Sequence, residues 1–149
     1  MNIGITATRE GLTGPQLTTI RRMLLPYTIH SDAVNTVHQG CCVGGDEQIT
    51  ILAFALGFRI CAHQPVDRRY YFSKLAYELS NYKCSELPYL DRNQEIVDHS
   101  DMLIGAPKEK SEVLRSGTWA TIRRAREGKG IHTVVVYTDG GFDEYNSHS

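Results

Sequence analysis

The sequence predicts an α/β protein with a Rossmann-like three-layer fold, built on a mainly parallel sheet of about five strands. Apolar runs of strand length alternate with longer runs in which apolar residues recur every three to four positions, a pattern typical of alternating strands and helices. The strand-length runs are nearly all apolar, as expected for strands covered on both faces. The 149 residues include no linker-like, repeated or low-complexity stretch. We therefore expect one domain over residues 1–149.

The first half of the chain predicts three strands and two helices. The expected strands are residues 2–7, 34–38 and 58–62. The first helix begins after Thr13 or Gly14, with Pro15 in the first turn, where proline is favoured. Its buried side chains are Leu17, Ile20 and Leu24, and those of the second helix are Ile49, Leu52, Ala53 and Leu56. Both sets recur at helical spacing and face the sheet.

The second half begins with its least regular stretch, residues 66–88, which is aromatic and polar. We expect a short helix near residues 71–79. Asp91 and Gln94 form a capping-box pattern at the start of the next helix, whose buried side holds Ile96 and Val97. Two more strands and a polar tail complete the chain: residues 102–104, 131–137 and 138–149.

The stretch between the last two strands has the composition of a phosphate-binding turn. A polar loop follows the strand and leads through Ser116, Gly117 and Thr118 into an amphipathic helix. Glycine lets a phosphate approach the backbone, and the first helical turn offers unpaired N–H groups at the positive end of the helix dipole. Arg115 adds a positive charge. The alternative interpretation is a surface loop with an ordinary Ser or Thr N-cap.

Several turns of this kind follow the expected strands. Because the carboxyl ends of parallel strands meet at one edge of a sheet, we expect these turns to converge there, where α/β proteins bind ligands. The expected ligand-binding residues are Thr6, Thr8, Arg9, Gly40, Gly44, Gly45, Asn93, Arg115, Ser116, Gly117 and Thr118. Their glycines, hydroxyl groups and arginines indicate a nucleotide-type site.

In the order and spacing of these turns the sequence resembles the SLOG superfamily of Rossmann-like domains. That group includes the Lonely Guy phosphoribohydrolases, DprA-type proteins and nucleotide-sensing domains of bacterial immune systems. The resemblance covers nearly the whole chain and rests on GITATR at residues 4–9, HQG at 38–40, VGGD at 43–46, YLDRN at 89–93, DMLI at 101–104 and SGTW at 116–119. It implies a nucleoside phosphate or a nucleotide-derived signal, such as a cyclic ADP-ribose, as the ligand.

The sequence departs from the enzymes of that group at one position. The Lonely Guy hydrolases carry a PGGxGTxxE loop, whose glutamate acts with an arginine on the ribose and the N-glycosidic bond. Gly117 and Thr118 match the Gly-Thr pair, and Arg92 matches the arginine, but the glutamate position holds Thr121. A threonine cannot serve as a carboxylate base. Cleavage would require another acid, from among Asp46, Glu112 and Asp91.

Arg92, Asp46 and Glu112 are therefore the candidate catalytic residues. Arg92 stands at a helix start, whose dipole disfavours a purely structural cation, so contact with phosphate or ribose is the preferred interpretation. Asp46 either caps the second helix or accepts hydrogen bonds from ribose hydroxyls. The aromatic residues between positions 70 and 82 are candidates for a wall over a purine, and Trp119 for packing in preference to base stacking.

We expect neither a metal nor a cofactor. Five side chains with metal-binding atoms fall near the ends of neighbouring strands: His38, Cys41, Cys42, Cys61 and His63. Cys61 and His63 share a face of their strand, but no pair has zinc-finger spacing, and buried cysteine is a common apolar filler. A nucleophilic cysteine at position 41 or 42, beside a helix N-terminus, is a lesser alternative.

Charge and composition bear on partners and location. The net charge is −1, with both signs interspersed, so nucleic acid is not an expected partner and DprA-like handling of single-stranded DNA is the weaker alternative. No apolar stretch reaches membrane-spanning length, and the four cysteines fit reduced thiols, so we expect a cytoplasmic protein. The resemblance implies a homo-oligomer.

Two functions follow from these observations. The first is binding of a nucleotide-type small molecule for sensing or sequestration, which the threonine at position 121 favours. The second is hydrolysis or transfer at an N-glycosidic bond of a nucleoside monophosphate. The apolar side of the helix that carries Ile96 serves either an oligomer interface or the core.

Overall fold

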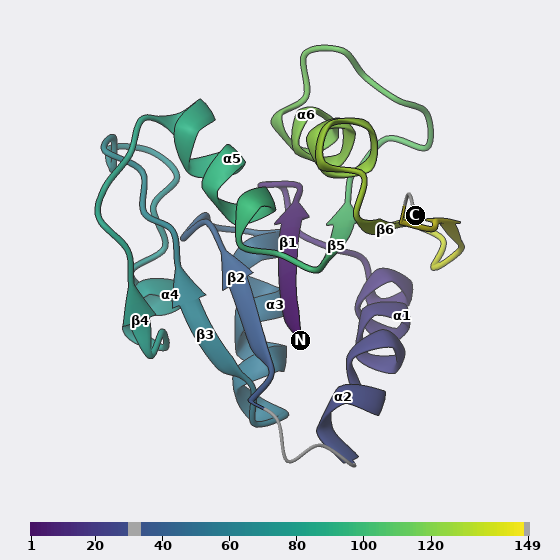
Figure 1. Cartoon of the computed structure of the whole chain (residues 1–149), viewed down its shortest axis with the longest axis horizontal. Coiled ribbons are helices and arrows are strands. Elements are labelled where there is room, and N and C mark those ends of the chain that lie inside the picture. The colour runs from purple at the N-terminus through teal and green to yellow at the C-terminus, as the bar shows by residue number, and fades with distance from the viewer. Residues whose placement is uncertain (30–33, 148–149) are drawn as a thin grey trace.

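The computed structural model of the chain describes residues 1–29 and 34–147, which form one sheet flanked by helices (Figure 1). In this part of the chain the sheet has seven strands in the order β4-β3-β2-β1-β5-β6-β7. Every neighbouring pair is parallel except β6 and β7, which are antiparallel. The strands are β1 Asn2–Ala7, β2 Thr36–Gln39, β3 Arg59–Ala62, β4 Tyr82–Lys83, β5 Met102–Ala106, β6 His132–Val136 and β7 Phe142–Tyr145.

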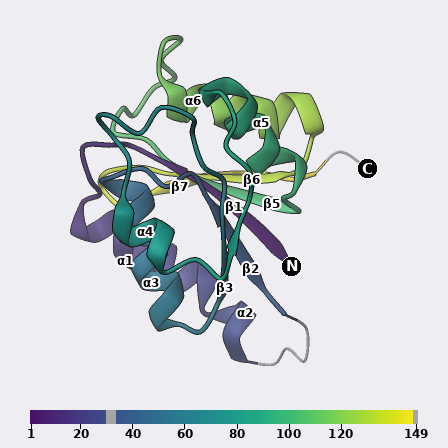
Figure 2. The same cartoon turned by 90° about the vertical axis from the view of Figure 1, so that its left-hand side faces the viewer.

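Helices cover both faces of the sheet, so the expected three-layer Rossmann-like architecture is confirmed (Figure 2). One face packs against α1 and α3, and the other against α5, α6 and η1. The helices are α1 Gly14–Leu24, α2 Pro26–Ile29, α3 Gly45–Ala55, α4 Lys74–Glu78, α5 Tyr89–Asp98, α6 Gly117–Arg123 and the π-helical turn η1 Arg124–Lys129.

The sheet has two more strands than the five expected, and both lie at its edges. β4 falls in the irregular aromatic stretch, and β7 falls in the expected polar tail, whose last two residues lie outside the described part of the chain. All residues of both strands are exposed. An edge strand without a buried face carries no apolar run, so its sequence lacks the signal that identified the five inner strands.

Buried side chains of α5 belong to the core. Ile96 and Val97 pack with Leu103 of β5 and Ile122 of α6 between the sheet and its helical layer. Of the two roles considered for this apolar face, the structure shows the core role. Within the described residues, no helix combines the length and apolar character that a membrane crossing requires.

The helix starts differ in part from expectation. α1 begins as predicted, with the Thr13 side chain and Gln16 forming a capping box. α3 begins at Gly45 with Gly44 as N-cap, so the interpretation of Asp46 as a cap is wrong. α5 begins at Tyr89, two positions before Asp91, so Asp91 lies within its first turn and is not its N-cap. Both helices therefore begin one or two residues before the aspartate that was expected to cap them.

Gly44 is required by the backbone at the start of α3. Its φ of 79° and ψ of −125° lie in a region that is open almost only to glycine, and an added Cβ would lie 2.2 Å from the Arg9 carbonyl oxygen. We expect Gly44→Ala to lower the free energy of unfolding by about 2 to 5 kcal/mol, from strain and overpacking together. Urea unfolding of the purified protein measures this change.

Gly14→Ala is the matched control for that experiment. Gly14 begins α1, and an added Cβ there meets no atom within 4 Å. Its change should stay within about 0.5 kcal/mol, as for most surface substitutions. Equal effects from the two substitutions would contradict the assigned role of Gly44.

Candidate functional site

A polar cleft of about 290 Å³ opens at the carboxyl edge of the sheet. It lies where β1 is flanked on one side by the turn after β2 and on the other by the loop between β5 and α6. The strand order reverses direction between β1 and β5, and crevices at such switch points are the usual ligand sites of open α/β sheets. The residues expected at the site that line the cleft are Thr6, Thr8, Arg9, Gly40, Asp46, Arg92, Asn93, Arg115, Ser116, Gly117 and Thr118.

Two of the expected glycines do not line the cleft. A Cβ on Gly45 would lie 2.4 Å from the Ala7 Cβ, and one on Gly44 would meet the Arg9 carbonyl. The two glycines therefore let the start of α3 pack directly against the end of β1. This close packing places Asp46, the next residue, at the base of the cleft.

Glu112 also lies outside the cleft lining. Its carboxylate forms ion pairs with Arg123 Nη1 at 2.9 Å and Arg126 Nη2 at 3.0 Å. Hydrogen bonds from the two arginines lower the pKa of Glu112. In the described structure this residue therefore holds the loop before α6 against the helix, away from the other candidate acids.

The start of α6 forms one wall of the cleft. Ser116 is its N-cap, and the Ser116 Oγ accepts a hydrogen bond from the Trp119 amide at 3.2 Å. Ser116 also lines the cleft, so the two interpretations of this residue, as a helix cap and as part of a binding site, both apply. A Cβ on Gly117 would lie 2.2 Å from the Tyr89 hydroxyl oxygen, so α5 approaches the backbone closely here. Lys108 and the exposed Arg115 add positive charge around this wall, and Lys108 pairs with Glu10 at 2.9 Å.

Arg92 is almost fully buried, with 3 % of its surface exposed, and it spans the cleft between α5 and the turn after β2. Its Nε–H donates to Asn93 Oδ1 at 2.9 Å, and its Nη1 donates to the Gly40 carbonyl. Its guanidinium carbon also lies 4.9 Å from the centre of the Tyr89 ring. A Cβ on Gly40 would lie 2.7 Å from Arg92 Nη1 and 3.2 Å from Asp46 Oδ2, so only glycine leaves room for both charged groups.

Asp46 has an unusual environment for a carboxylate. It is 6 % exposed, and its Oδ1 has no hydrogen-bond partner among the described residues. Burial raises the pKa of Asp46 to about 6, against the opposing influence of the Arg92 charge and of the backbone amides of Gly40, Ala7 and Cys42. A buried acceptor without a donor costs free energy, so this oxygen is suited to a donor supplied by a ligand.

An apolar hollow of about 350 Å³ adjoins the cleft. It shares Arg9, Cys42, Tyr89 and Arg92 with the cleft, and its further lining is mainly aromatic and apolar: Pro65, Val66, Tyr70, Tyr71, Phe72 and Pro88. The Arg9 guanidinium lies over the Tyr71 ring, 3.8 Å from its centre. Arg9 and Arg92 therefore mark the boundary between a polar and an aromatic compartment.

Sequence reasoning missed several residues of this region. Tyr89 lines both compartments, and its place in the YLDRN motif at residues 89–93 was a signal that could have identified it. Of the aromatic stretch, Tyr77 and Tyr82 do not line the hollow. Trp119 of α6 is buried in the core cluster that also holds Ile96 and Val97 of α5, as expected for packing, and its Nε1 has no partner in the described structure.

Three further side chains that the sequence offered for chemistry are Thr121, Cys41 and Cys42, and none has the environment that its role would require. Thr121, at the position of the family glutamate, is buried and donates a hydrogen bond from Oγ1 to the Gly117 carbonyl at 3.0 Å. Burial raises the pKa of Cys41 to about 12 and that of Cys42 to about 11. A raised pKa is the opposite of the lowered pKa that a nucleophilic cysteine requires, so burial does not favour that alternative.

Comparison with solved structures identifies the fold. The molybdenum cofactor binding protein of Rippkaea orientalis superposes with a TM-score of 0.65 at 16 % identity, over 91 % of this chain and 76 % of its own. DprA of Streptococcus pneumoniae superposes with a TM-score of 0.63 at 17 % identity, over 91 % and 50 % of the two chains. The chain has a SLOG-type Rossmann-like fold.

A further SLOG-type neighbour is DprA of Helicobacter pylori, with a TM-score of 0.59 at 18 % identity over 91 % of this chain and 65 % of its own. This chain therefore spans half to two thirds of the two DprA chains. No family model and no curated protein sequence matches the chain. Identities of this size show a shared fold alone, and what the site binds depends on its own residues.

Proposed function

We propose that the protein binds a nucleotide or a nucleotide-derived signal of the ADP-ribose or cyclic ADP-ribose type, for sensing or sequestration. The unpartnered Oδ1 of Asp46 carries this proposal. It belongs to a buried carboxylate in the lining of the cleft, where a ribose hydroxyl would supply the missing donor. Arg92 is already held by Gly40 and Asn93, and its charge offsets part of the cost of burying the carboxylate.

The start of α6 suits the phosphate end of such a ligand. Gly117 and Thr118 line the cleft at this helix start, where Thr118 brings a hydroxyl group, and the nearby cations Arg9, Lys108 and Arg115 supply positive charge. N–H groups at a helix start and flanking cations are the usual partners of phosphate groups. Because Ser116 Oγ already accepts from the Trp119 amide, its hydroxyl hydrogen is free to be donated to a phosphate oxygen.

The aromatic hollow suits the base. Its volume of about 350 Å³ and that of the cleft, about 290 Å³, each lie near the lower limit for a small-molecule pocket, and the two adjoin through Arg9 and Arg92. A base among Tyr70, Tyr71 and Tyr89, with its ribose at Asp46 and its phosphate at α6, would occupy both. Each compartment would then contact the part of a nucleotide that matches its chemistry.

Binding is favoured over cleavage because the position of the family glutamate holds Thr121 and the candidate acid Glu112 lies outside the cleft lining. Thr121 is held in a hydrogen bond within its helix, and Glu112 is held by two arginines. The second candidate function, an N-glycosidic-bond hydrolase or transferase acting on nucleoside monophosphates, is favoured by Asp46. Burial raises the pKa of Asp46 to about 6, which suits a general acid or base near neutral pH.

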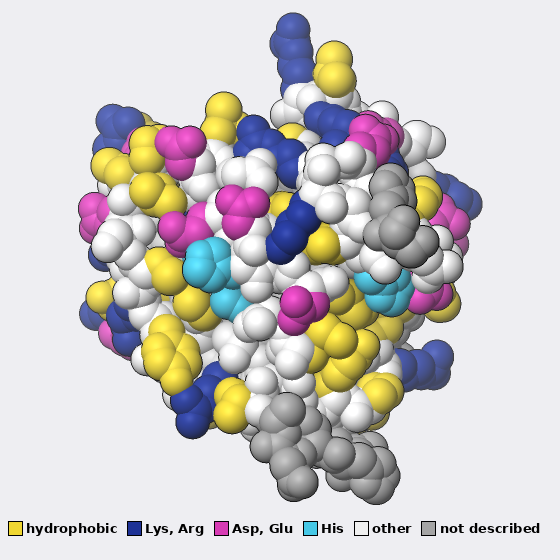
Figure 3. All heavy atoms as spheres, viewed as in Figure 1, with side chains coloured by type: hydrophobic (Ala, Val, Ile, Leu, Met, Phe, Trp, Pro, Cys, Tyr) yellow, Lys and Arg dark blue, Asp and Glu magenta, His cyan; other side chains and the backbone are white. Residues whose placement is uncertain are grey.

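A small ligand is also favoured over nucleic acid. One solved neighbour is a molybdenum cofactor binding protein and another is described in a single-stranded DNA binding mode, so this fold serves both kinds of ligand. On the face in Figure 3, basic and acidic side chains alternate without a broad basic surface. The net charge of −1 agrees with this pattern.

The proposal includes a cytoplasmic homo-oligomer. The four free cysteines fit a reducing compartment. Leu90 and Leu114 are 58 % and 83 % exposed on the α5 and α6 side, and burial of such side chains would stabilise a pair of chains. Light scattering of the purified protein measures the mass in solution, and a monomer at all concentrations would remove this part of the proposal.

Mass spectrometry of a nucleotide panel tests the function directly. The protein is incubated with nucleoside monophosphates, NAD, ADP-ribose and cyclic ADP-ribose isomers, and with a short single-stranded DNA, and is then denatured to release what it holds. We expect an intact nucleotide, retained by the wild type and lost in Thr118→Val. A free base that accumulates with time, and that disappears in Asp46→Asn, would establish the hydrolase. Retention of DNA alone, or of nothing, would overturn both candidates.

A further inference from the structure

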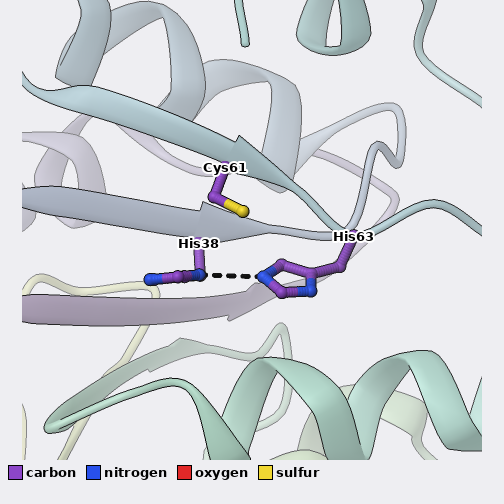
Figure 4. Close-up of side chains that lie close together, drawn as sticks. All are labelled: His38, Cys61 and His63. Atoms are coloured by element: carbon purple, nitrogen blue, oxygen red, sulfur yellow. Dashed lines mark hydrogen bonds between the residues drawn. The ribbon is translucent and has the colours of Figure 1, made fainter. Parts of the chain in front are cut away.

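A second cluster of reactive side chains lies outside the cleft, between the sheet and α5. His38 of β2 and Cys61 of β3 are cross-strand neighbours, and His63 follows on the same face of β3 (Figure 4). His38 Nδ1 and His63 Nε2 lie 2.8 Å apart, and both point toward each other below the Cys61 thiol. One metal-binding atom from each of these three buried residues lies within 4.8 Å of the others.

The outer nitrogens of both histidines face oxygen acceptors. His38 Nε2 lies 2.9 Å from Asn2 Oδ1, and His63 Nδ1 lies 2.5 Å from Glu95 Oε1 of α5. An oxygen acceptor fixes the ring proton on the nitrogen that faces it. The two inner nitrogens then direct lone pairs at each other across 2.8 Å, which is repulsive. A cation bound by both lone pairs would remove this repulsion.

We propose that His38, Cys61 and His63 bind a zinc ion, with Cys84 as the fourth ligand. Cys84 Sγ lies 3.6 Å from Cys61 Sγ, and Cys84 also lies within 4.8 Å of His63. Imidazole nitrogen and thiolate sulfur are the ligands of structural zinc, and in a tetrahedral site neighbouring ligand atoms stand about 3.3 to 3.8 Å apart. The two rings must therefore separate, and Cys84, which the structure groups with His63 and Glu95 and not with His38, must turn its thiol toward the other three ligands.

The surroundings supply what a metal site needs beyond its ligands. A zinc-bound histidine usually donates its other N–H to a carboxylate or a carbonyl, and Glu95 and Asn2 already hold these positions. Because the outer nitrogens of His38 and His63 face Asn2 and Glu95, the inner nitrogen of each ring is left available to a metal. On binding, the two thiols release their protons to solvent.

An open surface hollow lies next to the cluster. It is lined by Glu95, His99 and neighbouring residues of α5, and the His99 ring centre is 5.4 Å from that of His63. In Figure 3, histidine atoms reach this face beside acidic side chains. The metal would link β2, β3 and the loop before α5. Through Glu95 it would also fix the position of α5, the helix that carries Arg92 and Asn93.

Sequence spacing alone led us to expect no metal, because successive ligands are separated by 23, 2 and 21 positions along the chain and form no finger pattern. The parallel pairing of β2 with β3, and of β3 with β4 just before Cys84, brings them together. Cys41 and Cys42, which were considered with them, belong to neither of the metal-binding groups among the described residues.

Metal titration tests the proposal. The protein is purified with a non-thiol reductant, stripped with a chelator and titrated with zinc against a chromophoric competitor. We expect one zinc per chain, with release of about two protons. Cobalt(II) in place of zinc should give a thiolate-to-cobalt charge-transfer band. The Cys61→Ser variant should bind zinc at least a hundredfold more weakly and lose most of that band.

Two further variants keep the test valid if Cys61→Ser fails to fold. Glu95→Gln leaves all four ligands in place and should weaken zinc about ten- to a hundredfold through the orientation of His63. The matched control is Cys42→Ser, which removes a half-buried thiol outside the cluster and should bind zinc as the wild type does. A wild type that binds no zinc, or zinc affinity that is unchanged in both Cys61→Ser and Glu95→Gln, would overturn the proposal and leave a metal-free hydrogen-bonded network.

Discussion

Asp46→Asn is expected to stabilise the ligand-free protein by about 3 kcal/mol at pH 7.5 while weakening its binding of nucleotides. The raised pKa of Asp46, about 6 in place of 3.8, means that burial disfavours the carboxylate in the folded state more than Arg92 favours it. About two pKa units correspond to about 3 kcal/mol. Asparagine has nearly the same shape and no charge, so it removes this cost.

The stability that Asp46→Asn gains over the wild type should depend on pH. The folded state binds the Asp46 proton more tightly than the unfolded state does, because its pKa is the higher one. Wild-type stability from this group is complete below about pH 4, falls as the pH rises toward 6 and is constant above that. The gain in Asp46→Asn should therefore be near zero at pH 4 and largest above pH 6.5.

Urea unfolding of the two proteins at pH 4.0, 5.5 and 7.5 measures this difference. Other titrating groups contribute equally to both proteins, so their difference isolates Asp46. Asp91→Asn, in the exposed first turn of α5, serves as the control and should show no such trend. A variant less stable than the wild type at pH 7.5 would show that the carboxylate stabilises the fold, and that no ligand is needed to explain it.

The sequence predicted the inner five strands because their burial on both faces leaves continuous apolar runs. β1 was predicted with its observed bounds, Asn2–Ala7. β4 and β7 were missed because an exposed edge strand has no face that must be apolar. The observed starts of α3 and α5 depend on the residues that turn the chain into each helix. Gly44 and Pro88 turn the chain, and the acidic residues that follow do not cap the helices.

The candidate site was predictable where it depends on strand direction. Parallel strands bring Thr8, Gly40 and Ser116 to one edge whatever their side chains do, so these residues could be proposed from the order of elements. The roles of individual groups depend on packing and could not be predicted. Glu112 is held by two arginines of the helix that follows it. His38, Cys61 and His63 meet only because the strands pair in register.

Arg92→Met is expected to lower the free energy of unfolding by about 3 to 5 kcal/mol at pH 7.5, because it leaves a buried carboxylate without a nearby cation and buried acceptors without their donor. Methionine keeps the apolar length of the side chain but removes the donors to the Gly40 carbonyl and to Asn93 Oδ1. It also leaves the Asp46 carboxylate buried without a cation. Arg115→Met, at an exposed position in the same cleft, should change stability by less than about 0.5 kcal/mol.

The double variant Asp46→Asn/Arg92→Met separates the charge from the hydrogen bonds of Arg92. With no carboxylate to leave unpaired, Arg92→Met should cost less in the asparagine background than in the wild type, by about 1 to 3 kcal/mol at pH 7.5. Near pH 4 the carboxyl group is protonated, so this coupling should disappear. A cost that is equal in both backgrounds at both pH values would mean that Arg92 acts only through Gly40 and Asn93. The cleft would then contain an isolated carboxylate, and the ligand would have to supply a cation as well as a hydroxyl group.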